Sequence, residues 1–335
     1  MLEQPRKALS NPSSPLIYDR VMWHTMNKRH LRILEVHAAY KVQRYRAYGK
    51  VNLGLEVLGL RPDGYHEVLT VLQTVSLADE LTFEPSRGLS VTSDHPGVPC
   101  DGRNLVIQAG RVLQQKFGIR KGARIKITKR LPVGGGLGGG SSDAACALAG
   151  LSEMWNLNLE LETLEKLARE LGSDVPFFLR GGTCLGKGRG EVLEPLPPLP
   201  DCWVALIFPG FGVSTAWAYK NLEKKTKGLT NSGEYIKIIV SFLKSGQIQE
   251  VAKALYNRLE EVVFPIHPEL AGLKRGLIRA GAMGALLSGS GSAVYGLFGE
   301  EVRSKALSPH LEVPARVEVV RLRQARGWER ISESG

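Results

Sequence analysis

Apolar and polar residues alternate strictly from Lys50 to Val57, the pattern of a β-strand with one face in a core. The apolar positions of this run are Val51, Leu53, Leu55 and Val57. Lys50 and Asn52 lie on the other face, so their side chains are predicted to point the same way. A lysine on the polar face of a strand is usually solvated, and alternation alone does not tell a solvated Lys50 from a functional one.

Helical and strand-like segments follow one another along the chain without regular alternation. Helical periods cover residues 104–117 and 159–171, with further helical stretches near 234–259 and 268–280. Strand patterns cover residues 124–128 and 203–208, with others near Ala285 and Arg316. This mixed order predicts an α+β fold instead of a doubly wound parallel sheet.

A proline-rich segment divides the chain. Four prolines lie between Pro195 and Pro200, more than a helix or a central strand tolerates. The chain has 335 residues, of which 43% are hydrophobic, and this length favours two domains. The predicted parts are a first domain at 45–196, a second domain at 197–325 and a tail at 326–335. Residues 1–44 are expected to be a poorly ordered basic extension or the product of an upstream start site, because Met22 and Met26 offer later starts.

The charge and the apolar content limit the partners of the chain. The formal net charge is +11, but residues 1–49 hold nine Lys or Arg against three Asp or Glu, so over half of the excess lies near the N-terminus. Basic tails of this kind bind non-specifically and lack the interleaved aromatics of RNA readers, so we expect no nucleic-acid partner. No apolar stretch nears the ~20 residues of a membrane span and no signal-peptide core is present, which predicts a cytoplasmic protein without membrane contact. The four cysteines form no C-x-x-C pair, so neither a zinc site nor a disulfide framework is expected.

The densest glycine run of the chain joins the strand pattern at 124–128 to an alanine-rich helical stretch. Six of the seven residues from Gly134 to Gly140 are glycine, and Ser141 and Ser142 follow. Without Cβ atoms, consecutive N–H groups can turn toward one anion, and a helix capped by Ser141 or Ser142 adds its positive N-terminal end. Flexible linkers share this composition but seldom join a strand to a helix. The run therefore predicts a phosphate-binding loop.

The kind of phosphate loop is limited by what the run lacks. A Walker motif needs Gly-Lys followed by Ser or Thr, and no lysine lies between residues 131 and 151. Gly134, Gly136 and Gly139 fit the dinucleotide pattern with Glu160 at the expected offset, but so dense a run fits it trivially and Glu160 lies in a helical pattern. The Ser-Ser-Asp that opens the helix suits a nucleotide with bound Mg²⁺, since hydroxyl and carboxylate oxygens are Mg²⁺ ligands.

Four motifs together resemble the GHMP kinases, a family named for galactokinase, homoserine kinase, mevalonate kinase and phosphomevalonate kinase. They are residues 47–53 with 61–67, the glycine run, Gly-Ser-Asp-Val-Pro-Phe-Phe at 172–178 and Leu-Ser-Gly-Ser-Gly-Ser at 287–292. The resemblance spans residues 45–325. It implies a two-domain fold in which a domain like domain 2 of ribosomal protein S5 precedes a ferredoxin-like domain.

The resemblance implies a kinase that uses ATP and Mg²⁺. In it Asp174 accepts the proton of the substrate hydroxyl, and Lys50 pairs with Asp174 and with the phosphoryl group in transfer. The residues implied to bind ATP are Pro132, Val133, Gly134, Gly135, Gly136, Leu137, Gly138, Gly139, Gly140, Ser141 and Ser142. The metal ligands are not identified, and Ser142 is a candidate. Without the resemblance, the first interpretation of Asp174 from its position would be a turn or N-cap residue, which is common.

Two of the motifs resemble one branch of the family, whose small-molecule substrate is a cytidine diphosphate conjugate of methylerythritol. Asp63-Gly64 signals a turn, and the resemblance places Tyr65 and His66, which follow it, on the cytosine base. The residues implied to bind the substrate are Asn52, Tyr65, His66, Thr215 and Tyr219. Trp217 is a competing aromatic for the wall assigned to Tyr219.

Other readings of the chain stay open at this point. Another GHMP kinase, of the homoserine or mevalonate type, is one, although such small substrates would not require the Asp-Gly-Tyr-His segment. A dinucleotide-binding oxidoreductase and a basic nucleic-acid-binding protein are the others. The chain is expected to act as a monomer or a homodimer.

Overall fold

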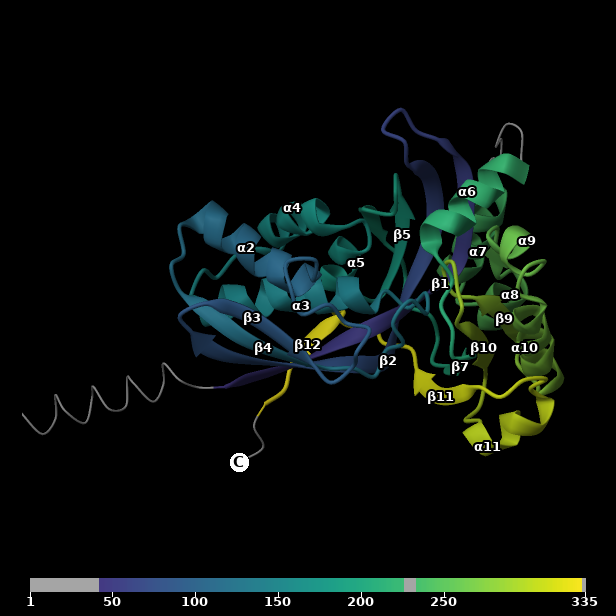
Figure 1. Ribbon diagram of the computed structural model, residues 1–335. Helices are drawn as coiled ribbons and strands as arrows, with labels where there is room; N and C mark the ends of the chain where they lie inside the picture. The colour runs from purple at the N-terminus through teal and green to yellow at the C-terminus, as the bar shows by residue number, and fades with distance from the viewer. Residues whose placement is uncertain (1–41, 226–232, 333–335) are drawn as a thin grey trace, which may run out of the picture. The chain divides into compact units, whose positions relative to one another are not determined.

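The computed structural model describes residues 42–225 and 233–332 (Figure 1). The extension predicted at 1–44 lies outside the described residues up to position 41. From residue 42 onward the chain forms two sheets and the helices that cover them, with the first sheet built mainly from the N-terminal half. Within the two described ranges no helix is long and apolar enough to cross a membrane.

The first sheet has eight strands. Its main path runs β12 (Trp328–Arg330), β1 (Gln43–Leu60), β2 (His66–Ser86), β4 (Gly122–Thr128) and β3 (Leu89–Ser93). Off this path, β5 (Thr183–Lys187) pairs with β2 and β6 (Val192–Pro195), and β8 (Tyr256–Asn257) pairs with β1. Only β3 with β4 and β1 with β8 are parallel. The strand predicted from Lys50 to Val57 is confirmed as the middle of β1, but its polar face is buried too, at Lys50, Asn52 and Glu56.

Four helices cover one face of this sheet: α2 (Leu105–Phe117), α3 (Gly139–Met154), α4 (Leu161–Leu171) and α5 (Val175–Arg180) (Figure 1). α2 and α3 pack on the strands, and α4 and α5 pack on α3. The side chain of Asn104 caps α2 by accepting the N–H of Val106, and Gly118 ends it in the left-handed conformation with φ of 63°. These ends confirm the helix predicted at 104–117, and α4 confirms the one at 159–171. α3 is buried over most of its length among alanines and leucines, which explains its weak amphipathic pattern.

The second sheet has four antiparallel strands: β7 (Trp203–Phe208), β9 (Gly284–Leu287), β10 (Val294–Phe298) and β11 (Arg316–Arg321). They lie in the order β11-β7-β10-β9, so the fourth, first, third and second strands of this half are neighbours. That is the order of a ferredoxin-like fold, and it confirms the predicted class.

The helices of this half are α6 (Thr215–Lys225), α7 (Glu234–Lys244), α8 (Ile248–Lys253), α9 (Glu260–Val263), α10 (Pro268–Arg279) and α11 (Ser304–Leu307), with the short 3₁₀ helix η1 (Ser308–His310). The helical prediction at 268–280 is confirmed by α10. The prediction near 234–259 is wrong in its last part, because the chain turns at Gly246 with φ of 68° and later leaves α8 to form β8.

The two halves share a core instead of meeting at a linker. Val51 and Leu53 of β1 pack in one cluster with Leu206 of β7 and Ile236 of α7. A Cβ atom on Gly54 would lie 2.5 Å from Cδ1 of Ile236, so this glycine lets α7 approach β1 closely. The domain boundary near residue 196 stays a prediction. The segment predicted as a tail contains β12, which pairs with β1. The sequence pattern did not predict this strand.

Candidate active site

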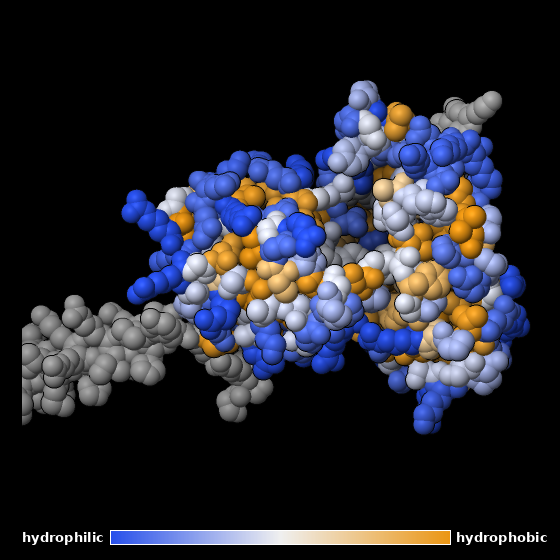
Figure 2. Space-filling view, in the orientation of Figure 1, coloured by the Kyte–Doolittle hydropathy of each residue, from blue (hydrophilic) through white to orange (hydrophobic). Residues whose placement is uncertain are grey.

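A cavity of about 920 Å³ lies between the two halves, and Figure 2 shows the surface hollowed there. Its walls come from β1, the β1–β2 turn, the glycine loop, the start of α5, α6 and the turn after β9. Its volume is at the upper end of the range for small-molecule sites. Most of the residues that the sequence assigned to chemistry line this one space.

The glycine loop lies between the end of β4 and α3 and forms one wall. Gly134, Gly136 and Gly138 have φ values of 72°, 79° and 71°, in the left-handed region that only glycine enters freely. A Cβ atom on Gly138 would lie 2.7 Å from the ring of Phe178. The glycines are therefore required both by the backbone conformation and by the neighbours of the loop.

The structure places most, but not all, of the predicted ATP-binding residues at the cavity. The residues of the loop that line it are Pro132, Val133, Gly134, Gly135, Gly136, Gly138, Gly139 and Gly140. Leu137 packs instead in the shared core, and Ser141 does not reach the wall.

Neither serine caps α3 as predicted, because the flexible glycines let the helix begin earlier. Gly138 is the N-cap residue, so no side chain caps the helix. Ser142 is fully buried, and its hydroxyl donates to the carbonyl oxygen of Tyr48 at 2.6 Å. Its oxygen therefore faces β1 and not the cavity, and we do not carry Ser142 forward as a Mg²⁺ ligand.

Lys50 lies where β1 passes the glycine loop. Its Nζ donates to Oδ1 of Asn52 at 2.7 Å and to the carbonyl oxygen of Gly136 at 3.0 Å. The amide of Asn52 is held in turn, because its Nδ2 donates to Oγ1 of Thr70 at 2.8 Å. Burial lowers the pKa of Lys50, and the nearby carboxylate of Asp174 opposes this effect. Lys50, Asn52 and Asp174 thus line the same cavity, but the predicted pairing of Lys50 with Asp174 is not among the ion pairs of the described residues.

Asp174 immediately precedes α5 and lines the cavity together with Ser173. It occupies the N-cap position of α5, but its side chain makes no capping hydrogen bond. The interpretation as a capping residue is therefore not supported. Its carboxylate acts electrostatically on Lys50 from β1 and on Tyr219 from α6, which places it between the two halves.

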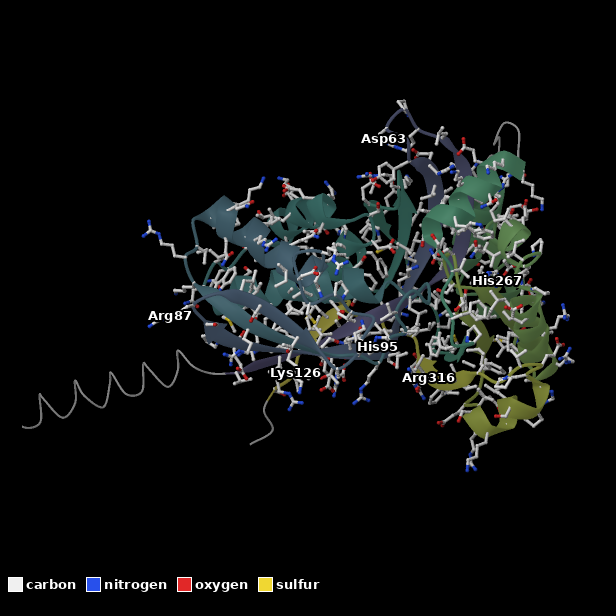
Figure 3. All side chains as sticks on the ribbon, viewed as in Figure 1. Asp63, Arg87, His95, Lys126, His267 and Arg316 are labelled. Atoms are coloured by element: carbon white, nitrogen blue, oxygen red, sulfur yellow. The ribbon has the colours of Figure 1, made fainter. Side chains whose placement is uncertain are left out.

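The other end of the cavity is aromatic. The β1–β2 turn, with Asp63 at its tip (Figure 3), leads to Tyr65 and His66, both of which line the cavity. The ring of His66 lies 5.2 Å from that of Tyr219 on α6, at an interplanar angle of 38°. Burial, followed by the charge of Asp174, raises the pKa of Tyr219. A flat heterocyclic ring could be held here by stacking.

Thr215 and Trp217 begin α6 on different sides of it. Thr215 lines the cavity, and its Oγ1 lies 2.8 Å from Oγ of Ser290, which ties α6 to the turn after β9. Trp217 is not part of the lining, and its ring makes an edge-to-face contact with the ring of His267 at 6.5 Å between centroids. Of the two competing aromatics, the structure brings Tyr219 to the cavity.

A buried ionic cluster lies beside the glycine loop, and sequence reasoning missed it. Lys129 lies between Asp79 of β2 and Asp143 of α3, with 3.1 Å from its Nζ to Oδ2 of Asp143. Oδ1 of Asp79 also accepts the backbone N–H groups of Arg130 at 2.6 Å and Leu131 at 2.8 Å. Two carboxylates share one cation here, so burial and the charge of Asp79 raise the pKa of Asp143 well above its usual range.

Lys129 and Asp143 line the cavity. A possible signal was the acidic residue in Ser-Ser-Asp after the glycine run, but nothing local links it to a strand residue more than sixty positions earlier. Arg189, Lys220 and Glu223 also line the cavity, and the sequence analysis did not single them out.

Comparisons with known proteins agree with this geometry. Family models described as the GHMP kinases N terminal domain and the GHMP kinases C terminal match residues 104–182 and 239–311. A 4-diphosphocytidyl-2-C-methyl-D-erythritol kinase of Gloeobacter violaceus is 43% identical over 270 residues, which cover 80% of this chain and 89% of that protein. The kinase of the same name from Pelotomaculum thermopropionicum is 46% identical over 253 residues, covering 75% and 87%.

Solved structures share the fold. A crystal structure of 4-(cytidine 5'-diphospho)-2C-methyl-D-erythritol kinase superposes with a TM-score of 0.69 at 36% identity, covering 83% of this chain and 98% of that one. A homoserine kinase from Cytophaga hutchinsonii has a TM-score of 0.72 at 21% identity, covering 87% and 97%. At that identity the second likeness concerns the fold alone.

Proposed function

The chain belongs to the GHMP kinase family, and we propose that it transfers the γ-phosphoryl group of ATP to the 2-hydroxyl of 4-diphosphocytidyl-2-C-methyl-D-erythritol. This reaction is a step of the non-mevalonate route to isoprenoid precursors. One observation carries the proposal: a single cavity is lined by the glycine loop, Lys50, Asp174 and the pair of His66 and Tyr219. Relatives that bear the name of this kinase and match most of the chain support the choice of substrate.

The chemistry asks mainly for positioning and for neutralisation of charge. The glycine loop and the N-terminus of α3 line the space where the triphosphate would lie, and N–H groups of such a loop and helix end can bind phosphate oxygens. Asp174 is the carboxylate we assign as acceptor of the hydroxyl proton. Lys50 is held by Asn52 and Gly136, so its ammonium group is already positioned for the charge that develops on the phosphoryl group in transfer.

Mg²⁺ fits the residues present at this end of the cavity. Asp143 and Asp174 are carboxylates in its wall, and Oδ1 of Asp143 is buried without a hydrogen-bond partner. No cluster of three His, Cys, Asp or Glu occurs in the part of the chain that the structure describes. When bound, Mg²⁺ would neutralise the phosphate oxygens.

The alternatives have less support. A dinucleotide site would need Glu160 near the end of a second strand, but Glu160 directly precedes helix α4. The strand before the glycine run also belongs to a largely antiparallel sheet. Kinases of the homoserine and mevalonate types share the fold at 21% and 19% identity. A likeness at this identity does not indicate that this chain acts on homoserine or mevalonate.

A coupled assay of ADP release tests the proposal directly. The purified chain is supplied with ATP and Mg²⁺, and the cytidyl substrate is compared with homoserine and mevalonate. We expect ADP release that depends on the cytidyl substrate alone. Release with homoserine or mevalonate, and none with the cytidyl substrate, would refute the proposed substrate and keep the reaction class.

A further inference from the structure

Arg189 lies in the β5–β6 turn at the aromatic end of the cavity. This turn is fixed to β2, because the N–H of Val68 donates to the carbonyl oxygen of Gly188 at 2.7 Å. The N–H of Gly188 also donates to Oε1 of Glu67 at 3.1 Å. The backbone next to Arg189 is therefore fixed by hydrogen bonds, and Arg189 lines the cavity.

The guanidinium group of Arg189 stacks on Tyr65. Its Cζ lies 4.5 Å from the centroid of the Tyr65 ring. Stacking holds the group in place and leaves its N–H donors, which point outward in the plane of the guanidinium, free to bind.

Those donors have little to bind within the protein. The nearest carboxylate oxygen, Oε1 of Glu191, is 3.9 Å from Nε, too far for a hydrogen bond. Among the hydrogen bonds of residues 42–225 and 233–332, none is donated by this guanidinium group. Arg103, the other arginine in the cavity wall, differs because three hydrogen bonds tie its side chain to Asp101.

Of the three lysines in the cavity wall, Lys220 of α6 has no ion pair or hydrogen bond among the described residues, and the other two are already engaged by the protein. Lys50 is bound to Asn52 and Gly136, and Lys129 lies between two carboxylates. The proposed acceptor carries a diphosphate next to its base, and this group needs cationic donors close to the aromatic residues. A guanidinium group matches two phosphate oxygens with two parallel N–H donors.

We propose that Arg189 binds the diphosphate of the cytidyl substrate, with the ring of Tyr65 holding the guanidinium group in position. This assignment rests on the proposed function and names the residue that recognises the anionic part of the substrate. It makes Arg189 a specificity residue, because a neutral nucleoside would gain nothing from it.

The test compares CDP with cytidine as competitive inhibitors against the cytidyl substrate. In Arg189→Gln we expect the inhibition constant of CDP to rise about 10- to 100-fold, the range for losing a hydrogen bond to a charged group. The inhibition constant of cytidine should stay within about twofold of wild type, since the base-binding rings are kept. Arg189→Lys should lie between, because it keeps the charge and loses the planar fork.

Lys187→Gln is the matched control. Lys187 lies on the same hairpin two residues away, pairs with Glu194 and is not part of the cavity wall. The control removes the same charge and should leave both inhibition constants unchanged. Thermal melts of all variants report on folding, and Arg189→Lys keeps the test informative if Arg189→Gln is unstable.

Equal losses for CDP and cytidine in Arg189→Gln would overturn the proposal, because Arg189 would then only support the ring. An unchanged inhibition constant for CDP would overturn it as well. If the wild-type protein neither phosphorylated the cytidyl substrate nor bound CDP or cytidine, the proposed function would be refuted, and the diphosphate site with it.

Discussion

Replacing Gly136 by alanine should disable the glycine loop without removing any charged group. The backbone of Gly136 has φ of 79°, a conformation that costs an L-residue about 1–2 kcal/mol. A Cβ atom there would lie 2.0 Å from the carbonyl oxygen of Ser288 and 3.2 Å from the nitrogen of Gly291. Both neighbours are backbone atoms and cannot rotate away. The loop and the turn after β9 must therefore move apart before the oxygen reaches the 3.0 Å that real Cβ atoms keep.

This movement should reach Lys50, the lysine we assign to the transfer of the phosphoryl group. The carbonyl oxygen of Gly136 accepts hydrogen bonds from Nζ of Lys50 at 3.0 Å and from Oγ of Ser288 at 3.0 Å. A misplacement of about 1 Å can cost about 100-fold in rate, so kcat/KM should fall by about that factor. The strain of the left-handed backbone alone should lower Tm by about 2–8 °C, at about 2–4 °C per kcal/mol.

Coupled ADP release and thermal melts measure the two effects, with Gly88→Ala as the control. A Cβ atom on Gly88 has no heavy atom within 4 Å, and Gly88 lies in the β2–β3 turn away from the cavity. The control should keep kcat/KM and Tm within error of wild type. Gly136→Ala with wild-type kcat/KM and Tm would refute the argument that the missing Cβ atom positions the loop.

Three further predictions test other parts of the site. Asp174→Asn should lower kcat at least ~10²-fold, as for loss of a general base, with KM for ATP unchanged; an unchanged kcat in steady-state assays would remove Asp174 from the mechanism. Tyr219→Ala should raise KM for the cytidyl substrate about 2- to 10-fold through lost stacking, whereas Trp217→Ala should not, and the reverse result would make Trp217 the wall. Asp79→Ala should lower the free energy of unfolding by about 1–3 kcal/mol in denaturant titrations, because the N–H groups of Arg130 and Leu131 lose their acceptor while Asp143 still pairs with Lys129; a loss under about 0.5 kcal/mol would show that Asp79 stabilises little.

Local patterns in the sequence predicted the elements that carry the site. A period of two residues places Lys50 and Asn52 on one face of β1, and their side chains meet at 2.7 Å. The same pattern could not show what covers that face. The polar face of β1 is buried because the glycine loop and α7 pack on it, and both come from distant parts of the sequence. The alternation therefore predicted a strand with one exposed face, although both faces of β1 are buried in this segment.

The capping prediction at α3 failed because two local rules compete there. Serine is a favoured N-cap, but a run of glycines also lets a helix begin at any of several positions. Gly138 takes the left-handed conformation and α3 starts at Gly139, which leaves Ser142 inside the first turn. Its hydroxyl then meets the carbonyl oxygen of Tyr48. The choice between the two starts depends on packing against β1, which no window of the sequence contains.

Helix geometry explains why the aromatic wall was ambiguous and how the structure resolves it. Trp217 and Tyr219 are two residues apart on α6, which turns about 200° between them, so only one of the two can face the cavity. The sequence limits the wall to this pair, and the position of His66 at the end of the β1–β2 turn decides between them. Arg189 shows the same limit more strongly, because its partner Tyr65 belongs to a hairpin more than a hundred positions earlier. Residues that act through one long-range contact leave no periodic trace, and only the assembled cavity identifies them.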